Sequence, residues 1–290
     1  MKKKILFFAV VMLAIMSVFA IVASAEDISE GIRKAGHTPI VMNNVEAKAK
    51  TARERYEKCI FLDKDIPLGL SLEIAGTRLF NNMGSIELCS DKRRLKAFLE
   101  NDFPIPETIE YPLTYFPNED FFKEFAEKVC DELGLPVVAK FATGSQGREV
   151  FLLNTKEEVL EFQRKNYIIP HLYQKFIASS KGKDMRVYVV GNNAVAAMIR
   201  ENETDFRSNV AIGGSAKKTE VTDEINTLCT DVSNLLGLDF CGIDLLFTPN
   251  GFVVCEVNAN ALFAAMNEVC DIHTGHLIAD HVISFKTGNL

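Results

Sequence analysis

Hydrophobic and polar positions first alternate in short blocks. Up to about residue 83, apolar runs of four or five residues, each bounded by turn residues, are separated by longer amphipathic or polar stretches. Strand and helix alternating at this spacing predict a small parallel α/β domain. The strands are expected at 39–42, 58–62 and 77–80, and the helices at 27–35 and 66–75, with a polar helix or a linker at 47–56.

From residue 85 the pattern changes. One charge-rich helix is expected over 86–101, and Phe103-Pro-Ile-Pro106 ends it, because proline cannot continue a helix. We place the domain boundary at the change of pattern near residue 85, with 26–84 in the first domain and 85–290 in the second. Antiparallel strands with intervening helices predict an α+β arrangement for the second domain. Its helices are expected at 119–133, 156–165, 224–236 and 276–285, with strands at 136–140, 149–153 and 172–177 and hairpins at 184–200 and 241–258.

Residues 1–25 support two interpretations. Lysines 2–4, the uncharged apolar run 5–22 and the small residues 23–25 match a secretory signal peptide or a membrane anchor. Alternatively, residues 4–9 form a buried first strand, followed by an apolar helix that continues to Gly36, as in a βαβ unit. The pattern alone leaves both open.

Composition narrows the classes of function. The chain has 290 residues, of which 48% are hydrophobic, so it can bury a large core. A net charge of −7 argues against extended nucleic-acid binding, which needs a clustered basic surface. Seven cysteines without C-x-x-C spacing indicate buried, reduced thiols and a reducing compartment.

The hairpin near the C-terminus carries the strongest chemical signal. In the apolar runs 241–247 and 252–260 the only charged side chains are Asp244 and Glu256, and Asn258 shares a strand face with Glu256. Buried carboxylates repel each other unless a cation neutralises them, so the set predicts an Mg²⁺ site shared with nucleotide phosphates. The alternative is two carboxylates satisfied by backbone N–H groups.

A second signal is a lysine before a glycine loop. Lys140 ends an apolar strand, and Gly144-Ser-Gln-Gly147 follows, whose backbone N–H groups could close over phosphate oxygens. The lysine precedes the loop, so this is a lid and not a P-loop. An ordinary surface turn is the alternative.

Two arginines lie in strands that are otherwise almost wholly apolar. Arg186 and Arg200 need anionic partners there, because a guanidinium does not lose its charge on burial. A ligand phosphate is favoured for Arg200, whereas Arg186 could equally pair with Asp184 or another acid. Residues 205–209 add a further arginine and an amide, and residues 212–216 add a loop that could close over a carboxylate substrate. The alternative is that this segment is an ordinary polar loop. None of the five histidines lies in a motif, and none is assigned a catalytic role.

The order of these motifs is informative as a whole. They are Asp91-Lys92 opening a helix, 136–140, 144–147, 173–177, 182–186, 196–200, 206–209, 242–244 and 256–258. In this order they resemble the ATP-grasp superfamily and, within it, the RimK-like α-L-glutamate ligases. The resemblance implies a small parallel pre-ATP-grasp domain followed by a two-lobed ATP-grasp domain. It also implies an enzyme that joins a carboxylate to an amine through an acyl-phosphate made from ATP.

The resemblance also implies roles for individual residues. Lys92 and Lys140 would contact the nucleotide phosphates, and Gln174, Lys175, Phe176 and Ile177 would lie against adenine. Ser145, Gln146 and Asp184 would also belong to the nucleotide site. Two Mg²⁺ or Mn²⁺ ions would be held by Asp244, Glu256 and Asn258. Arg200 and Asn209, with Lys140, would act on the transferred phosphate, and Arg207 and Asn209 would face the substrate carboxylate.

We therefore expect an ATP-dependent ligase that adds L-glutamate or a similar amino acid to a small-molecule or peptide carboxylate. The alternative is a non-catalytic nucleotide-binding or regulatory module of the same origin, anchored to a membrane. Nucleic acid is not an expected partner, and a homo-oligomer stays open. Because ATP and free thiols fit a cytoplasmic location, residues 5–22 are expected to pack into the first domain or to hold an inward-facing ligase at the membrane.

Overall fold

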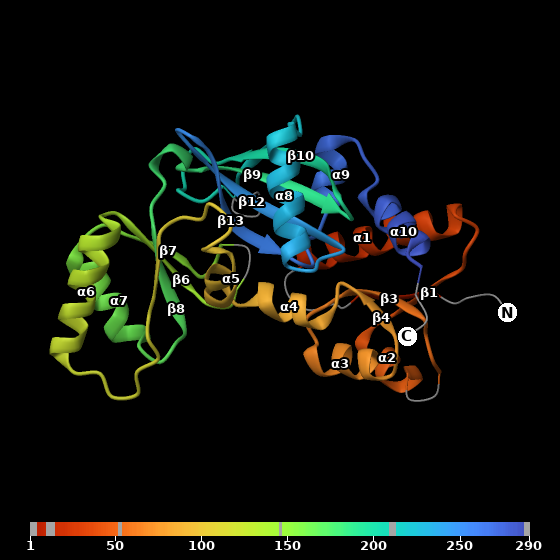
Figure 1. The fold of residues 1–290 in the computed structure, drawn as a ribbon, viewed down its shortest axis with the longest axis horizontal. Helices are drawn as coiled ribbons and strands as arrows, with labels where there is room; N and C mark the ends of the chain where they lie inside the picture. The colour runs from red at the N-terminus through yellow and green to blue at the C-terminus, as the bar shows by residue number, and fades with distance from the viewer. Residues whose placement is uncertain (1–4, 10–14, 52–53, 145–146, 209–212, 287–290) are drawn as a thin grey trace.

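The computed structural model describes residues 5–9, 15–51, 54–144, 147–208 and 213–286, which are arranged around three β-sheets (Figure 1). The first sheet has four parallel strands in the order β2-β1-β3-β4. The predicted parallel α/β arrangement at the start of the chain is therefore confirmed. Its elements are β1 (Ile5–Ala9), α1 (Ile15–Lys34), β2 (Pro39–Met42), α2 (Asn44–Thr51), β3 (Lys58–Leu62), α3 (Ile66–Ile74) and β4 (Arg78–Phe80).

The apolar N-terminal segment contributes β1 and the start of α1. Strand β1 pairs on both sides, with β2 and with β3, so it is an inner strand of the sheet. Ile28 and Ile32 of α1 are fully buried in a cluster that includes Ile278 and Val282 near the C-terminus. The described part of this segment thus follows the strand–helix interpretation. Across the described ranges, no helix is both long and apolar enough to cross a bilayer.

The other two sheets are antiparallel, as expected for the second part of the chain. One has the order β5-β8-β6-β7 and is covered by α6 and α7, at the left of Figure 1; the other has the order β11-β10-β9-β12-β13. The elements of the first are β5 (Thr108–Glu110), α6 (Glu119–Leu133), β6 (Val137–Phe141), β7 (Val150–Leu153), α7 (Lys156–Asn166) and β8 (His171–Lys175). After the short η1 (Ala178–Ser180) come β9 (Lys183–Val190), β10 (Asn193–Glu201), β11 (Ser215–Thr219), α8 (Asp223–Leu235), β12 (Phe240–Thr248), β13 (Gly251–Asn258), α9 (Ala264–Cys270) and α10 (Thr274–Ser284).

The single helix predicted over 86–101 is wrong. The chain forms α4 (Met83–Ser90) and α5 (Lys92–Leu99), separated by Asp91 in an extended conformation. The Asp91 carboxylate accepts hydrogen bonds from the N–H groups of Arg93 and Arg94, which makes it the N-cap of α5. Lys92 consequently occupies the first position of α5, in agreement with the motif that opens a helix at this point.

The loop predicted over 212–216 is shorter than expected. Ser215 and Ala216 begin β11, which pairs antiparallel with the end of β10. The prediction for 209–212 lies outside the described residues. Strand β5 and helix α9 were also not predicted.

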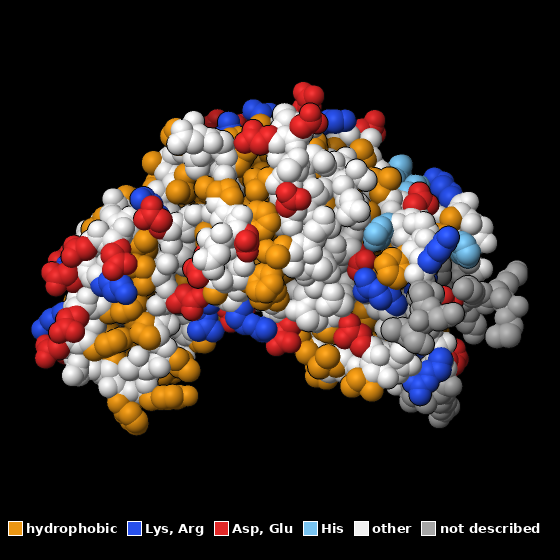
Figure 2. All heavy atoms as spheres, in the orientation of Figure 1, with side chains coloured by type: hydrophobic (Ala, Val, Ile, Leu, Met, Phe, Trp, Pro, Cys, Tyr) orange, Lys and Arg blue, Asp and Glu red, His pale blue; other side chains and the backbone are white. Residues whose placement is uncertain are grey.

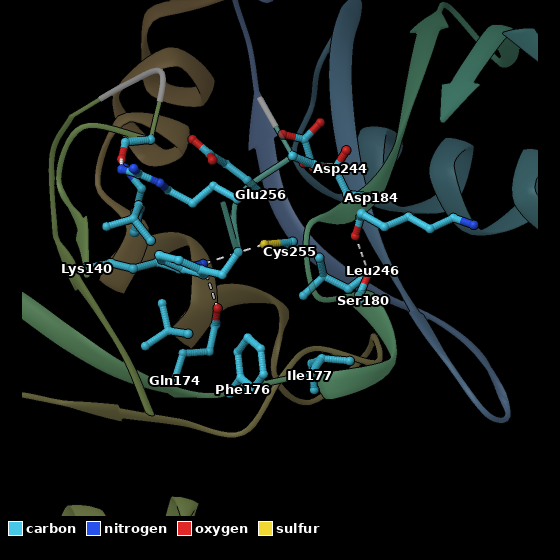
Figure 3. A pocket seen from close by; sticks show the side chains of 18 of the residues that line it. Lys140, Gln174, Phe176, Ile177, Ser180, Asp184, Asp244, Leu246, Cys255 and Glu256 are labelled. Carbon is cyan, nitrogen blue, oxygen red and sulfur yellow. Dashed lines mark hydrogen bonds between the residues drawn. The ribbon is translucent and has the colours of Figure 1, made fainter. Parts of the chain in front are cut away.

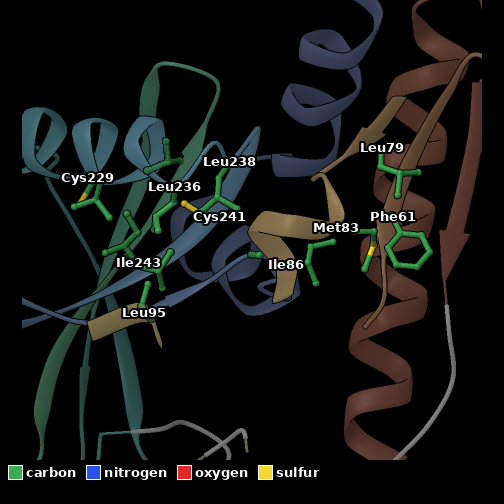
Figure 4. Packing of buried hydrophobic residues seen from close by; sticks show 14 of the residues in the cluster. Phe61, Leu79, Met83, Ile86, Leu95, Cys229, Leu236, Leu238, Cys241 and Ile243 are labelled. Carbon is green, nitrogen blue, oxygen red and sulfur yellow. The ribbon is translucent and has the colours of Figure 1, made fainter. Parts of the chain in front are cut away.

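Two of the buried clusters show how the sheets are joined. One extends from Phe61 and Leu79 of the parallel sheet through Met83 and Ile86 of α4 to Ile243 of β12 (Figure 4). The β5-β8-β6-β7 sheet packs its own separate core under α6 and α7. The parallel sheet and the five-stranded sheet therefore form one packed body, and the lobe with α6 and α7 carries a core of its own.

The cysteines fit the prediction of reduced thiols. All seven are free, and four of them, Cys59, Cys229, Cys241 and Cys270, are buried. Burial raises the pKa of Cys241 to about 12.

The side-chain amide of Asn81, which follows β4, connects the parallel sheet to the five-stranded sheet. The residue is fully buried. Its Nδ2 donates to the carbonyls of Phe240 (2.8 Å) and Ala259 (2.7 Å), and its Oδ1 accepts from the N–H groups of Asp239 (2.5 Å) and Phe240 (3.2 Å). Backbone groups thus satisfy both N–H donors and both acceptor lone pairs of the amide.

We predict that Asn81→Ala lowers the free energy of unfolding by about 3 kcal/mol, because buried backbone groups lose their partners. Urea unfolding measures this. Asn101→Ala, at an exposed position after α5, is the control and should stay within about 0.5 kcal/mol of the wild type. Equal stability of the two variants would show that the Asn81 amide is not a structural tie.

Candidate active site

A single cleft collects most of the residues singled out in the sequence. It lies between the lobe of β6 and β8 and the face of β9, β12 and β13, and it contains about 950 Å³ of empty space, its open mouth included (Figure 3). Three predicted residues, Ser145, Gln146 and Asn209, lie outside the described residues. The predicted residues that line it are Lys92, Lys140, Gln174, Lys175, Phe176, Ile177, Asp184, Arg200, Arg207, Asp244, Glu256 and Asn258.

The β12–β13 hairpin places the predicted metal-binding side chains together. Asp244 is directly opposite Glu256, and Gly242 is opposite Asn258, so the three oxygen-bearing side chains share one face. Asp244 is buried, whereas Glu256 and Asn258 are partly exposed. This grouping is the one that the alternation of the hairpin predicts.

The hairpin also contains an irregularity that alternation does not predict. Asp244 pairs with Glu256, but the next pair is Leu245 with Val254, so Cys255 is an extra residue at a β-bulge. As a result Cys255 lines the cleft beside Glu256, with its Sγ 3.5 Å from the Nζ of Lys140 (Figure 3). Strict alternation would have turned this thiol to the opposite face.

Asp244 is the centre of a buried chain of charges. It accepts from Arg186 through Nε and Nη2, both at 2.7 Å, and the Nη2 of Arg200 lies 3.1 Å from its Oδ2. Arg200 in turn donates to both oxygens of Asp184, at 2.7 and 2.5 Å. Burial by itself would raise the pKa of Asp244, but the two guanidinium groups outweigh it and hold that pKa below its usual range. Asp244 is therefore an ionised carboxylate.

These contacts revise what was expected of the arginines. Arg186 pairs with Asp244 and not with Asp184. This agrees with the prediction, which allowed another acid as its partner. Arg200, for which a ligand was favoured, already binds Asp184 with two hydrogen bonds. Its Nη1 makes no hydrogen bond to a described residue. Glu256, by contrast, forms no hydrogen bond or ion pair with the described side chains.

Lys140 is held in place by a buried amide. Its Nζ donates to the Oε1 of Gln174 at 2.7 Å, and the Nε2 of Gln174 donates to the hydroxyl of Thr108 at 3.1 Å. Lys140 and Gln174 are 8% and 2% exposed. The amide of Gln174 therefore fixes the ammonium group of Lys140 at the cleft wall.

The glycine loop is tied down at both ends. The Nζ of Lys92 donates to the carbonyl of Gly144 at 3.0 Å, and the Nη1 of Arg207 donates to the carbonyl of Gly147 at 2.5 Å. Gly144 has φ +135°, and a Cβ there would lie 2.5 Å from Glu149, so only glycine fits. Burial lowers the pKa of Lys92, although Glu256 opposes this.

An apolar end of the cleft follows β8. Phe176 and Ile177 lie there with Leu246 of β12 (Figure 3). Lys175 points its charge at Glu107, 2.6 Å away. The cleft thus has a flat apolar end and a charged end, which suits a ligand with an aromatic base and phosphates.

A model of the RimK-like ATP-grasp domain matches residues 91–282 of the chain. The chain belongs to the RimK-like ATP-grasp family. It is 38% identical to human N-acetylaspartylglutamate synthase A over 226 residues, which are 77% of this chain and 56% of that protein. It is 34% identical to human β-citrylglutamate synthase B over 77% of its length and 57% of the relative. The chain thus spans little more than half the length of these relatives.

A bacterial relative matches over more of its length. The probable α-L-glutamate ligase of Maridesulfovibrio salexigens is 28% identical over 89% of this chain and 91% of that protein. Among solved structures, D-alanine–D-alanine ligase from Bacillus anthracis superposes with a TM-score of 0.73 at 16% identity, covering 97% of this chain and 96% of that one. The ligase PsnB, with a precursor, Mg and ADP, gives 0.69 at 17% identity, covering 98% of both chains. The predicted ATP-grasp fold and RimK-like family are confirmed.

Lys96, which the sequence did not single out, lies behind the strand that carries Glu256. It is 3% exposed, and its Nζ donates to the carbonyl of Val254 at 2.7 Å. Burial lowers the pKa of Lys96 to about 7, with Cys255 acting in the opposite direction.

We predict that Lys96 makes stability rise with pH. Between a folded pKa of about 7 and the unfolded value of about 10.4, the unfolded state binds more protons, so raising the pH favours folding. The difference in unfolding free energy between wild type and Lys96→Met should grow by about 2–3 kcal/mol from pH 7 to 9.5. Urea titrations at several pH values measure it, and Lys165→Met, at an exposed site, should give a flat difference. If the difference in unfolding free energy between wild type and Lys96→Met does not change with pH, Lys96 is not buried as an uncharged amine.

Proposed function

We propose that this chain is an ATP-dependent carboxylate–amine ligase that adds L-glutamate or a similar amino acid to a carboxylate. The observation that carries the proposal is the meeting of Asp244, Glu256 and Asn258 with Lys140 in one cleft. A site that only bound a nucleotide would not require this complete set of hard oxygen donors beside a fixed ammonium group. Membership of the RimK-like family supports the same activity.

The cleft suggests how ATP would lie. The adenine would pack against Phe176 and Ile177 at the apolar end, and the phosphates would reach Lys140 and Lys92. The glycine loop would cover them, with Ser145 and Gln146 as its central residues. Lys92 and Arg207 would keep the loop close to the phosphates through their hydrogen bonds to Gly144 and Gly147.

The donor set fits a hard divalent cation. Asp244, Glu256 and Asn258 offer carboxylate and amide oxygens, the ligands that Mg²⁺ prefers, and water and phosphate oxygens would complete the shell. Glu256 would supply the uncompensated charge, because Asp244 is already paired with two arginines. When bound, Mg²⁺ or Mn²⁺ would supply charge neutralisation on the phosphate oxygens.

The reaction would have two transfers. The acceptor carboxylate would attack the γ-phosphorus of ATP and release ADP, and the amine would then attack the acyl carbon and displace phosphate. Lys140 and Arg200 would stabilise negative charge on the transferring group, Arg200 through its remaining Nη1. Arg207 and Asn209 would face the substrate carboxylate, and Asp184 would hold Arg200 in position.

The test is to incubate the purified protein with ATP, Mg²⁺, a carboxylate acceptor and each amino acid in turn, and to measure the phosphate released. The names of N-acetylaspartylglutamate synthase A and β-citrylglutamate synthase B make N-acetylaspartate and citrate the first acceptors to try, with L-glutamate as the amine. We expect phosphate release that depends on both substrates and an amide product by mass spectrometry. Nucleotide binding without substrate-dependent release would favour the regulatory module instead.

Glu256→Gln serves as the inactive control in this assay. It should lower the rate by about 10³-fold or more, because several kcal/mol of transition-state stabilisation are lost with a metal ligand. The melting temperature should stay near that of the wild type, since Glu256 has no side-chain partner among the described residues. Glu268→Gln, on the exposed side of α9, should keep full activity. Turnover at the wild-type rate in Glu256→Gln would show that the metal assignment is wrong.

We also propose that the ligase works on the cytoplasmic side, where ATP is available. The inner position of β1 in the parallel sheet supports this, because withdrawing the strand into a membrane would break its ladders with β2 and β3. Cell fractionation of a C-terminally tagged chain should recover an inward-facing product that retains Met1. An exported product beginning at Glu26 would overturn the location.

A further inference from the structure

A second group of ligand-type side chains lies away from the cleft, where α1 meets α10. Asp27 of α1, His273 at the N-cap of α10 and His276 in its first turn each bring one ligand atom within 4.8 Å of the others. None of the three lines the cleft. Several separate histidine side chains are visible on the side of the molecule where α1 and α10 lie (Figure 2).

The spacing of the ligand atoms fits a small tetrahedral site. The Oδ1 of Asp27 lies 3.0 Å from the Nδ1 of His273 and 3.6 Å from the Nε2 of His276. Metal–ligand bonds of about 2.0–2.1 Å at tetrahedral angles place neighbouring ligand atoms about 3.3 Å apart. The two distances lie on either side of that value, and the three ligand atoms all lie within 4.8 Å of one another. The imidazole rings are stacked, with centroids 4.5 Å apart and planes at 11°, so one ring would have to turn for both in-plane lone pairs to point at one ion.

The carboxylate is already oriented for such a role. The Oδ2 of Asp27 accepts from the backbone N–H of Gly275 at 2.7 Å and from the side chain of Asn267 at 2.8 Å. Asn267 also accepts from the N–H of Thr274 at 3.0 Å. These hydrogen bonds fix the carboxylate so that Oδ1 faces both imidazoles, as outer-shell partners do in metal sites.

The histidine on the inner side has an unused nitrogen. The Nε2 of His276 is buried and has no hydrogen-bond partner among the described residues. Buried polar atoms of this kind are uncommon and call for an explanation such as an ion or a water. The helices are close here because of glycine: a Cβ at Gly31 would lie 2.7 Å from the Cα of His276, and one at Gly275 would lie 2.5 Å from the backbone of Ile28.

We propose that Asp27, His273 and His276 form a structural site for a divalent transition ion such as Zn²⁺. Two imidazole nitrogens and one carboxylate oxygen form a borderline donor set, which favours Zn²⁺ over Mg²⁺ or Ca²⁺. Water would take the fourth position, or Glu30, whose Oε2 is 3.9 Å from the Nε2 of His276. The ion would fasten the first helix of the chain to the last, independently of the proposed ligase activity.

The experiment is a calorimetric titration with Zn²⁺ on chain purified without a polyhistidine tag, in excess Mg²⁺ to occupy the cleft. Wild type, His273→Ala, His276→Ala and the control His37→Ala are compared. We expect one tight ion per chain in wild type and His37→Ala, and affinity at least tenfold weaker in the other two. Asn267→Ala should weaken binding by about 10–100-fold through Asp27.

Two further measurements separate this site from other zinc ligands. At a hundredfold excess over the wild-type Kd, Zn²⁺ should raise the Tm of wild type by about 5 °C or more, and that of His276→Ala by about half as much or less. Co²⁺ substitution should give the visible bands of a tetrahedral nitrogen–oxygen site without a thiolate charge-transfer band. His273 is 65% exposed, so His273→Ala keeps the fold and isolates the ligand effect. Equal zinc affinity in wild type and both histidine variants, a thiolate band, or no binding to wild type would each overturn the proposal.

Discussion

The five-stranded sheet depends on how it buries charge. Arg186, Asp244, Arg200 and Asp184 occupy three neighbouring strands whose other residues are mostly apolar, and all four are linked by hydrogen bonds or ion pairs. Isolated, each would cost several kcal/mol to remove from water, whereas the chain of alternating signs compensates them mutually. The same arrangement fixes the position of Asp244 opposite Glu256. The candidate cleft therefore owes its geometry to a requirement of the fold.

The sequence was informative where local rules act alone. The turn at 248–251 and strand alternation were enough to place Asp244, Glu256 and Asn258 on one face. Alternation could not place Cys255 there, because a β-bulge depends on the pairing partner as well as on the strand itself. The partner of Arg186 was likewise unpredictable, since choosing between Asp184 and Asp244 requires the register of β9 against both neighbours.

The helix boundaries also show the difference between what local sequence predicts and what depends on the rest of the fold. Asp91 is a good N-cap residue, but within a continuous charged stretch its capping role emerges only when the backbone turns toward the cleft. The apolar N-terminal run was ambiguous for a different reason. Hydropathy measures the preference of a segment for an apolar environment, and the interior formed by α9, α10 and the parallel sheet offers one as well as a bilayer does. The pairing of β1 with β2 and β3, which the run alone does not specify, distinguishes the two.

The separate core of the lobe with α6 and α7 has a mechanical consequence. Because its apolar cluster does not continue across the cleft, turning this lobe relative to the five-stranded sheet would leave both hydrophobic interiors covered. The polar contacts that would have to be exchanged include those of Lys92 and Arg207 with the glycine loop and that of Lys140 with Cys255. Hydrogen bonds of this kind reform readily with water or with a phosphate. Rotation of this lobe would therefore be opposed by hydrogen bonds and not by a shared hydrophobic core.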